Sequence, residues 1–300
     1  MRIAITGGTG FVGRHLATRL TEAGHESVIL SRRTGLGLDV GADRLAEALR
    51  GCDAVVHCAG INREIGDQTY DAVHVRGTEA IVEAARAAEV GRVVMLSFLR
   101  ARPDGPTSYH RSKWAAEELV RRSGLTYTVL KAGVIHGRGD HMLDHLSHAF
   151  HTFPVFGLVG LREHDVRPVA VDDVTRLLAA AAFGDPRLTD RTVAVLGPEA
   201  MPLGEAVRRV ARVTGHRPLF VRLPVAVHLG IAAVAEATMR VPLISIAQVR
   251  ILAEGVVEAA PFADRPPDDL APSTPFSDDA IREGLPDPGG FGLADLRCAT

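Results

Sequence analysis

Residues 2–13 read RIAITGGTGFVG. The apolar run Arg2–Thr6 predicts a short buried strand, and the pattern from about residue 12 to residue 23 predicts a helix. Between them stand Gly7, Gly10 and Gly13, which permit a tight turn and a close backbone approach to an anion. The helix N-terminus then offers unpaired N–H groups and a positive dipole end. A strand, a glycine turn and a helix in this order predict a dinucleotide pyrophosphate site. The alternative is a tight turn without a ligand.

Short apolar runs alternate with helical patterns through the first half of the chain. Further strands are predicted at residues 26–31, 54–57, 92–97 and 126–131, and helices at residues 44–50, 78–88 and 112–122. Strands that alternate with helices predict an α/β fold with a doubly wound parallel sheet of the Rossmann type. Nearly continuous apolar strands are expected when helices cover both faces of such a sheet.

The pattern loosens after residue 133. Helices are predicted near residues 173–182, 203–214, 224–239 and 245–254, one strand at residues 192–196, and a surface loop at residues 260–275. No obvious linker separates the two halves. We therefore expect residues 1–133, with parts of 165–200, to form the dinucleotide-binding domain. Residues 134–300 would mostly form a smaller C-terminal substrate lobe.

Composition excludes several classes of partner. The chain has 300 residues, 34 of them basic and 36 acidic, so its formal charge of −2 does not predict capture of nucleic acid or of an anionic membrane. The apolar stretch 224–241 contains His228 and Glu236 and is short for a bilayer span. Cys52, Cys58 and Cys298 form no C-x-x-C pair, and no signal-peptide pattern opens the chain. These features predict reduced thiols in a cytoplasmic protein. We expect the protein to be a monomer or a homodimer.

The residues after the second strand bear on the choice of cofactor. NAD-binding proteins usually place an acidic residue there to contact the adenosine ribose. This chain has Ser31, Arg32 and Arg33 instead. Guanidinium groups pair with a 2′-phosphate, so we expect NADP(H) to be preferred and NAD(H) to be possible. The alternative is two solvated arginines. Asp39 is either an acceptor for the adenine amino group or a loop residue.

Four later segments carry a family resemblance. They are VHCAG at residues 56–60, VRGT at residues 75–78, YHRSK at residues 109–113 and RPVAVDDV at residues 167–174. With the glycine turn, in this order and spacing, they resemble the short-chain dehydrogenase/reductase superfamily. The chain is most similar to its extended and atypical branches, which include epimerase/dehydratase-like, complex I accessory-subunit-like and NmrA-like proteins. The resemblance covers roughly residues 1–225.

The resemblance implies an acid/base pair of Tyr109 and Lys113. A spacing of four places both on one helix face, and the chain has only three tyrosines and two lysines. The family's Lys lowers the pKa of the phenol and holds the nicotinamide ribose. A structural Tyr–Lys pair is the alternative. Ser97 is the candidate for the third catalytic residue, the hydroxyl that contacts the substrate carbonyl.

The chain departs from the family pattern at several positions. Where extended members often carry the catalytic hydroxyl, one or two residues after Ser97, this chain has Phe98 and Leu99, although Thr107 or Ser108 could substitute. The usual Asn before the V-x-G-T segment is His74, and the usual Arg-Pro-Gly is Lys131-Ala132-Gly133. These changes leave cofactor binding intact and weaken the case for efficient carbonyl reduction.

The resemblance and the glycine turn together give a cofactor-binding set. It comprises Gly7, Thr9, Gly10, Phe11, Val12, Gly13, Ser31, Arg32, Arg33, Asp39, Val40, Cys58, Ala59, Gly60, Lys113 and Ala132. The function that follows is an NADP(H)-dependent oxidoreductase acting on a small carbonyl or alcohol. Two alternatives are an epimerase, isomerase or lyase that retains its cofactor, and a non-enzymatic NADPH sensor or assembly protein.

His141, His145, His148 and His151 would share one face if their segment is helical. Two or three such side chains could ligate a transition metal. We expect instead no metal, and either a polar helix at the substrate cleft or a substrate contact by at least one of these histidines.

Overall fold

The computed structural model describes residues 1–239, 244–261 and 263–292. Cys298 and the last two residues of the apolar stretch 224–241 lie outside the described residues. The chain divides into two compact units. Unit 1 comprises Met1–Gly133, Val171–Leu196 and Glu258–Ser273, and unit 2 comprises Val134–Ala170, Gly197–Val257 and Thr274–Thr300.

Unit 1 is built on a six-stranded parallel sheet in the order β10-β5-β4-β3-β1-β2. The strands are β1 (Arg2–Thr6), β2 (Glu26–Leu30), β3 (Ala54–His57), β4 (Arg92–Phe98), β5 (Thr126–Ala132) and β10 (Arg191–Val195). The helices are α1 (Phe11–Glu22), α2 (Ala42–Leu49), α3 (Gly77–Ala87), α4 (Ser108–Arg121) and α6 (Val171–Ala182). Short helical segments are η1 (Arg32–Thr34), the π-helix η2 (Asp71–Arg76) and η3 (Asp268–Leu270).

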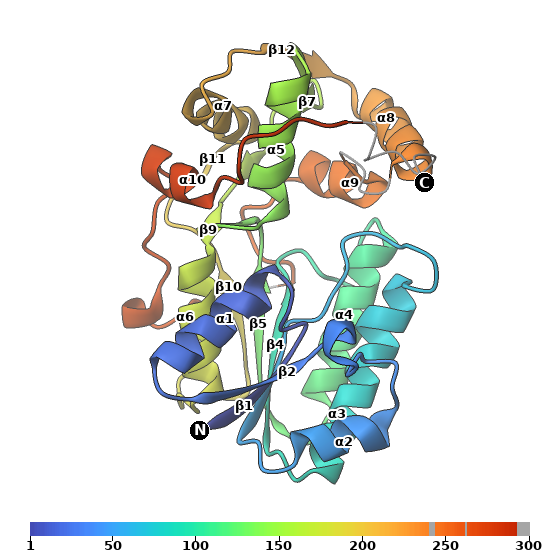
Figure 1. Cartoon of the computed structure of the whole chain (residues 1–300), viewed down its shortest axis with the longest axis vertical. Helices are drawn as coiled ribbons and strands as arrows, with labels where there is room; N and C mark the ends of the chain where they lie inside the picture. Colours follow the sequence, from blue (N-terminus) through green and yellow to red (C-terminus); the bar gives the residue numbers. More distant parts are fainter. Residues whose placement is uncertain (240–243, 262, 293–300) are drawn as a thin grey trace. The chain divides into compact units, whose positions relative to one another are not determined.

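Helices cover both faces of this sheet, because its strands are apolar on both sides. Helix α1 packs beside α6 on one face, whereas α2, α3 and α4 pack together on the other (Figure 1). The core on that second face joins strand residues such as Val55 and Met95 to helix residues such as Leu45, Ile81 and Ala116. The predicted Rossmann-type α/β fold is therefore confirmed.

Strand order places the candidate site. Strand β1 has β2 on one side and β3 on the other, so the chain switches direction across the sheet at β1. Ligands of open parallel sheets bind outside the carboxyl ends of the strands at such a point. The glycine turn after β1 and the residues after β2 and β3 all lie at this edge.

Segment 258–264 also belongs to unit 1. Asp264 forms a parallel bridge with Val193 of β10, and the N–H of Ala260 donates to Leu99 O at 3.1 Å. Residues 260–275, predicted as a loop, thus include a short stretch that extends the sheet beyond β10.

Unit 2 is a smaller α/β assembly. Its strands are β6 (Ile135–His136), β7 (Val155–Val159), β8 (Asp165–Val166), β9 (Val169–Ala170), β11 (Met201–Pro202) and β12 (Leu219–Leu223). Its helices are α5 (His141–Thr152), α7 (Leu203–Val213), α8 (Val225–Thr238), α9 (Ile246–Glu254) and α10 (Asp278–Gly284). Apolar residues of these elements, among them Leu143, Val210, Ala232 and Ile281, form its core. Within the described part of the chain, no helix is long and apolar enough to cross a membrane.

Candidate functional site

The glycines of the turn after β1 stand where a side chain would have no room. Gly7 has φ +65°, and a Cβ there would lie 2.8 Å from Ala59 Cα. A Cβ on Gly13 would lie 2.7 Å from Gly8 Cα. The N–H of Gly7 donates to Leu30 O at 2.9 Å, and that of Gly10 donates to Gly7 O at 2.8 Å. The turn is therefore packed backbone against backbone between the ends of β2 and β3.

Helix α1 begins at this turn with an open N-terminus. Gly10 is its N-cap and supplies no side-chain hydrogen bond, and its first turn has no acidic residue. Phe11 is half-buried and Val12 is buried, so their side chains anchor the helix while its first N–H groups point toward the turn. This cradle fits a pyrophosphate, because it offers N–H donors, a positive dipole end and no side chain in the way.

The segment after β2 presents two guanidinium groups. Ser31 starts η1, and its hydroxyl accepts from the Thr34 N–H at 3.3 Å. Arg32 and Arg33 are exposed, and neither forms an ion pair with any described residue. Asp39 is also exposed, whereas Val40 packs on the core of unit 1. Two unneutralised guanidiniums thus lie at the strand end that faces the adenosine ribose in this fold.

His57, the last residue of β3, is held by two threonines. Its Nδ1 lies 2.7 Å from Thr6 Oγ1, and its Nε2 lies 3.1 Å from Thr78 Oγ1. Because the Thr78 hydroxyl donates to His74 O, it must accept from His57 Nε2–H. Burial, with the charge of Lys113, lowers the pKa of His57 to about 3. His57 is therefore a neutral structural side chain behind the loop 58–60.

His74 links that loop to helix α4. Its Nε2 accepts from the Ile61 N–H at 3.1 Å, so its Nδ1–H donates to Ser112 Oγ at 2.8 Å. The Ser112 hydroxyl in turn donates to Tyr109 O at 3.1 Å. Burial, with the charge of Lys113, lowers the pKa of His74 to about 2. The residue at the family's Asn position is thus a neutral connector, 1% exposed.

Tyr109 stands in the first turn of α4 among aromatic rings. Its ring centroid lies 5.6 Å from that of Tyr70, 5.6 Å from that of His74 and 5.3 Å from that of Phe98. Burial and then the nearby Tyr70 raise the pKa of Tyr109 above its ordinary value. This direction is opposite to the lowering that the resemblance implies, because apolar surroundings disfavour the phenolate. The phenol therefore keeps its proton at neutral pH.

Lys113 follows Tyr109 by one helical turn and is 7% exposed. Its ammonium donates to Leu96 O at 3.3 Å, and a Cβ on Gly60 would lie 3.1 Å from Nζ. Burial lowers the pKa of Lys113 to about 8, and the charge of Glu117 opposes this shift. The ammonium thus lies against the loop 58–60, and most of it is protonated at pH 7.

Ser97 and Ala132, two residues of the predicted set, are buried and bonded to other parts of unit 1. The Ser97 hydroxyl donates to Glu117 Oε1 at 2.6 Å and belongs to a buried polar cluster under α4. Phe98, the next residue, packs on the Tyr109 ring. Ala132 is buried, and its carbonyl accepts from the Leu99 N–H at 2.8 Å.

The two substitute hydroxyls have other partners. Thr107 is the N-cap of α4 and bonds His110, and Ser108 is exposed and accepts from Arg111. The structure therefore brings together the glycine turn, the loop 58–60, Tyr109 and Lys113. It does not add Ser97, Thr107 or Ser108 to them.

Two residues around Tyr109 and Lys113, Tyr70 and Glu117, were not predicted as part of the site. Tyr70 stacks on His74, with ring centroids 5.5 Å apart, and its hydroxyl donates to Asn62 O at 2.9 Å. Glu117 carries the carboxylate that pairs with Lys131 and whose charge opposes the effect of burial on the pKa of Lys113. Glu117 had a sequence signal, the third position of a Tyr-x-x-x-Lys-x-x-x-Glu helix stripe, whereas Tyr70 had none.

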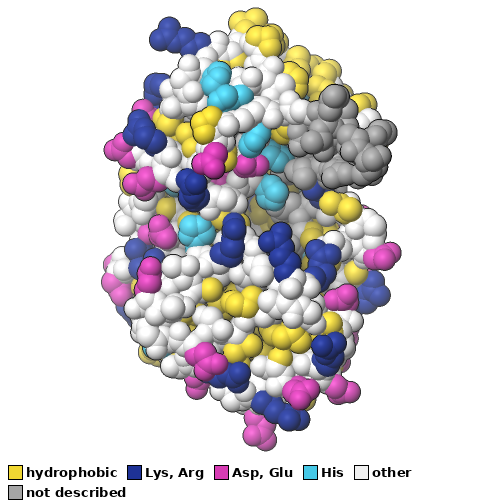
Figure 2. All heavy atoms as spheres, viewed as in Figure 1, with side chains coloured by type: hydrophobic (Ala, Val, Ile, Leu, Met, Phe, Trp, Pro, Cys, Tyr) yellow, Lys and Arg dark blue, Asp and Glu magenta, His cyan; other side chains and the backbone are white. Residues whose placement is uncertain are grey.

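The histidine row lies on α5 in unit 2, and Figure 2 shows histidine side chains over this helix. His148 Nδ1 donates to Asp144 O at 2.7 Å, and His151 Nδ1 donates to Ser147 O at 2.8 Å. The His148 ring also lies 5.5 Å from that of Phe291. No group of three or more His, Cys, Asp or Glu suited to a metal occurs among residues 1–239, 244–261 and 263–292.

Comparison with known proteins gives concordant similarities. Residues 7–141 match a family of NAD(P)H-binding proteins. The chain is 30% identical to the ceramide reductase of Caulobacter vibrioides over 74% of this chain and 73% of that protein. It is 28% identical to mouse mitochondrial NADH dehydrogenase [ubiquinone] 1 alpha subcomplex subunit 9, over 72% of this chain and 64% of that protein.

A solved nucleoside-diphosphate-sugar epimerase from Staphylococcus aureus has the same fold. It superposes with a TM-score of 0.68 at 15% identity, over 94% of this chain and 99% of that one.

Proposed function

This chain belongs to the extended branch of the NAD(P)H-binding short-chain dehydrogenase/reductase family, and from that premise we propose that it is an NADP(H)-dependent reductase of a small carbonyl compound. In the reverse direction it would oxidise the corresponding alcohol. NAD(H) would be the weaker cofactor, because Arg32 and Arg33 stand exposed and unneutralised where an NAD-specific carboxylate would lie.

The cofactor would occupy the carboxyl edge of the sheet. Gly7, Gly10 and Gly13 would admit its pyrophosphate to the N-terminus of α1. Lys113 would donate to the nicotinamide ribose, since its ammonium lies against the loop 58–60. When bound and reduced, the cofactor supplies a hydride to the carbonyl carbon.

Tyr109 would supply the proton. Its phenol is protonated at neutral pH, because burial raises its pKa. As the carbonyl oxygen gains negative charge, the Tyr109 O–H bond breaks and a new O–H bond forms on the substrate. The phenolate that remains would be stabilised by the Lys113 ammonium one turn along the same helix.

One observation carries this proposal. Tyr109 and Lys113 share a buried face of α4, and the Lys113 ammonium lies beside Gly60, in the loop that also packs on the glycine turn through Ala59 and Gly7. A cofactor seated on that turn would therefore reach toward the Tyr–Lys pair. A Tyr–Lys pair with a purely structural role would not need that shared edge.

The decisive variant is Tyr109→Phe, which removes one oxygen and keeps the ring packing. We expect turnover to fall roughly 10²- to 10⁴-fold, the usual contribution of a positioned proton donor. NADPH affinity should barely change, because the phosphate contacts lie elsewhere. The measurement is loss of NADPH absorbance with a panel of aldehydes, ketones and quinones, alongside calorimetric NADPH binding.

Tyr127→Phe is a matched control, because Tyr127 is a strand residue of β5 outside the site. It should leave turnover unchanged. If the wild type reduces a panel member and Tyr109→Phe does so equally well, Tyr109 is not the proton donor.

A second function has a specific observation in its favour. Phe98 covers one side of the Tyr109 ring, and the Ser97 hydroxyl is bound to Glu117, so the predicted third catalytic residue is held away from this role. A non-enzymatic NADPH-binding role fits that arrangement, and a complex I subunit is among the relatives. Tight NADPH binding by a wild type that oxidises NADPH with no panel member would favour it.

A further inference from the structure

Both lysines of the chain neighbour the buried Glu117 carboxylate: Lys131 as an ion pair, and Lys113 one helical turn before it on α4. All other basic residues are arginines, and Lys113 and Lys131 are the only lysines among 300 residues. Both are buried, Lys113 at 7% and Lys131 at 0% exposure, and Glu117 is also 0% exposed. Lysine is rarely buried without a partner, and Glu117 is the buried carboxylate near both ammonium groups.

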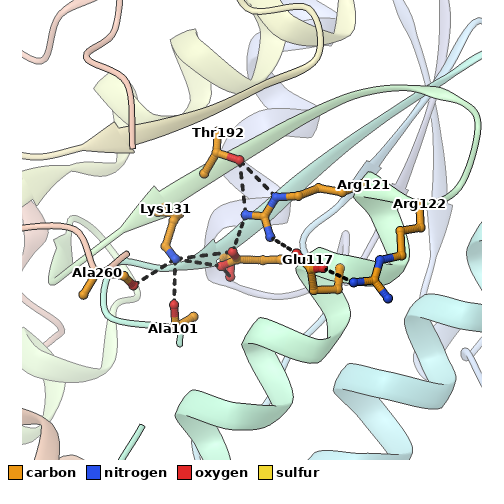
Figure 3. A network of polar contacts seen from close by, with 9 residues as sticks. Ala101, Glu117, Arg121, Arg122, Lys131, Thr192 and Ala260 are labelled. Atoms are coloured by element: carbon orange, nitrogen blue, oxygen red, sulfur yellow. Dashed lines mark hydrogen bonds and ion pairs between the residues drawn. The ribbon is translucent and has the colours of Figure 1, made fainter. Parts of the chain in front are cut away.

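The Glu117 carboxylate accepts hydrogen bonds from several side chains, including those of Lys131 and Arg121 (Figure 3). The Lys131 ammonium lies 3.3 Å from each of its carboxylate oxygens. Arg121 donates to Oε2 at 2.6 Å, and the Ser97 hydroxyl donates to Oε1 at 2.6 Å. Lysine and arginine can only donate, so both oxygens act as acceptors of an ionised carboxylate.

The same carboxylate lies on the face of α4 that carries the candidate site. Tyr109, Lys113 and Glu117 follow one another at intervals of four residues, and all three are buried. Residues at this spacing are neighbours on a helix, with Cβ atoms about 5–6 Å apart. The partners of Glu117 come from β4 through Ser97 and from β5 through Lys131, so this face is fixed to the sheet.

We propose that Glu117 is a positioning residue of the site. Its buried carboxylate balances the charge of the Lys113 ammonium and clamps helix α4 to strands β4 and β5. That this region is an active site rests on the proposed function, whereas the charge balance between Glu117 and Lys113 does not. Lys131 completes the clamp, because its ammonium also donates to Ala101 O at 2.8 Å and to Ala260 O at 3.2 Å.

Among the groups around Lys113, Glu117 has the opposite charge, and it also pairs with Lys131 and Arg121. At the end of β3 stands the neutral His57, followed by Cys58, whose thiol pKa burial raises to about 12. On η2 stands the neutral His74, and on α4 the protonated Tyr109. Strand β4 contributes only the Leu96 carbonyl. Of these neighbours, Glu117 alone carries a carboxylate, and its charge opposes the effect of burial on the Lys113 pKa.

The test reads the two lysines directly. Protein labelled with ¹³C at the lysine Cε gives two signals, which Lys131→Met assigns. The wild-type Lys113 signal should titrate near pH 8. In Glu117→Gln the pKa of Lys113 should fall by about 1 unit or more, as expected on losing an opposite charge at this range. This readout needs neither cofactor nor substrate.

Glu118→Gln is the matched control. Glu118 is the next residue on α4 and pairs with Arg121 and Arg122 nearer the surface. It should leave both lysine titrations unchanged. If Glu117 only stabilised the fold, Glu117→Gln would also leave the pKa of Lys113 unchanged.

A second variant covers the case in which Glu117→Gln does not fold, since it leaves Lys131 buried and unpaired. Glu117→Gln/Lys131→Met removes both charges, so no lysine is left buried beside an uncharged partner. A lower Lys113 pKa than in Lys131→Met alone supports the proposal. An unchanged Lys113 titration in whichever of these variants is folded overturns it. If the wild type shows no reductase activity but the Lys113 pKa shifts in the Glu117 variant, the proposed function is wrong and the role of Glu117 still holds.

Discussion

Arg32 and Arg33 are the residues on which cofactor choice depends. Both are exposed, and no described carboxylate pairs with them. We predict that NADPH binds at least tenfold more tightly than NADH, a difference of about 1.4 kcal/mol, and that Arg32→Glu reverses the preference through repulsion of the 2′-phosphate. Calorimetric titration of both cofactors measures this. Arg282→Glu, on α10, makes the same charge change in unit 2 and should have no effect. Equal wild-type affinities for the two cofactors would contradict the prediction.

Lys113 gives a pH dependence of stability with a definite sign. Its pKa is about 8 in the folded protein against 10.5 for the ordinary side chain. Between these values the unfolded chain holds the proton and the folded chain does not, so stability rises with pH. Relative to Lys113→Met, wild type should gain on the order of 2 kcal/mol from pH 7.5 to pH 10. Denaturant unfolding of both proteins at both pH values measures it, and a constant difference between them would show that the Lys113 pKa is ordinary.

Helix α1 and its turn act as one element, in which glycine is required by packing. A Cβ at Gly13 would meet the backbone of Gly7 and Gly8. Overpacking of this kind costs about 1–3 kcal/mol, so Gly13→Ala should lose stability and at least tenfold in NADPH affinity. Gly230→Ala is the matched control, because Gly230 is also helical, in α8, with nothing within 4 Å of its Cβ position. It should be neutral or gain up to about 1 kcal/mol. Thermal unfolding and NADPH titration of both variants decide between packing and helix propensity.

The elements of unit 1 differ in how far the sequence predicts them. Apolar runs and glycines set the strands and the turn, since both are local patterns. Helix α4 begins at Ser108 and not at the predicted Ser112, because Thr107 caps it. Thr107 is a cap signal that the sequence contains, and the earlier start includes Tyr109 in the helix, as its spacing from Lys113 implied. The partners of His74 and Ser97 could not be predicted, because they lie 38 and 20 residues away and depend on how α4 packs.

At the scale of the whole molecule, the residues proposed to bind the cofactor all belong to unit 1. Cofactor at 100 times its dissociation constant should stabilise the state that binds it by about 2.7 kcal/mol. We therefore predict that NADPH slows hydrogen exchange of the turn 7–13, of residues 31–40 and of the loop 58–60. The α8 region of unit 2 should change less. Exchange measured by mass spectrometry with and without NADPH tests this, and protection found mainly in unit 2 would place the cofactor elsewhere.

The burial of both lysines has a practical consequence for following this protein's motions. An amine-acylating reagent can modify a lysine only when Nζ reaches solvent, and here both side chains are buried inside unit 1. With no other lysine in the chain, acylation at Lys113 and Lys131 would count openings of the sheet-and-helix layer around Glu117, without an engineered label. If the two sites react at one common rate, α4 leaves the sheet as a single piece. If Lys113 reacts sooner, the region beside Gly60 opens to solvent locally while the contacts of Glu117 with Lys131 and Ser97 remain formed.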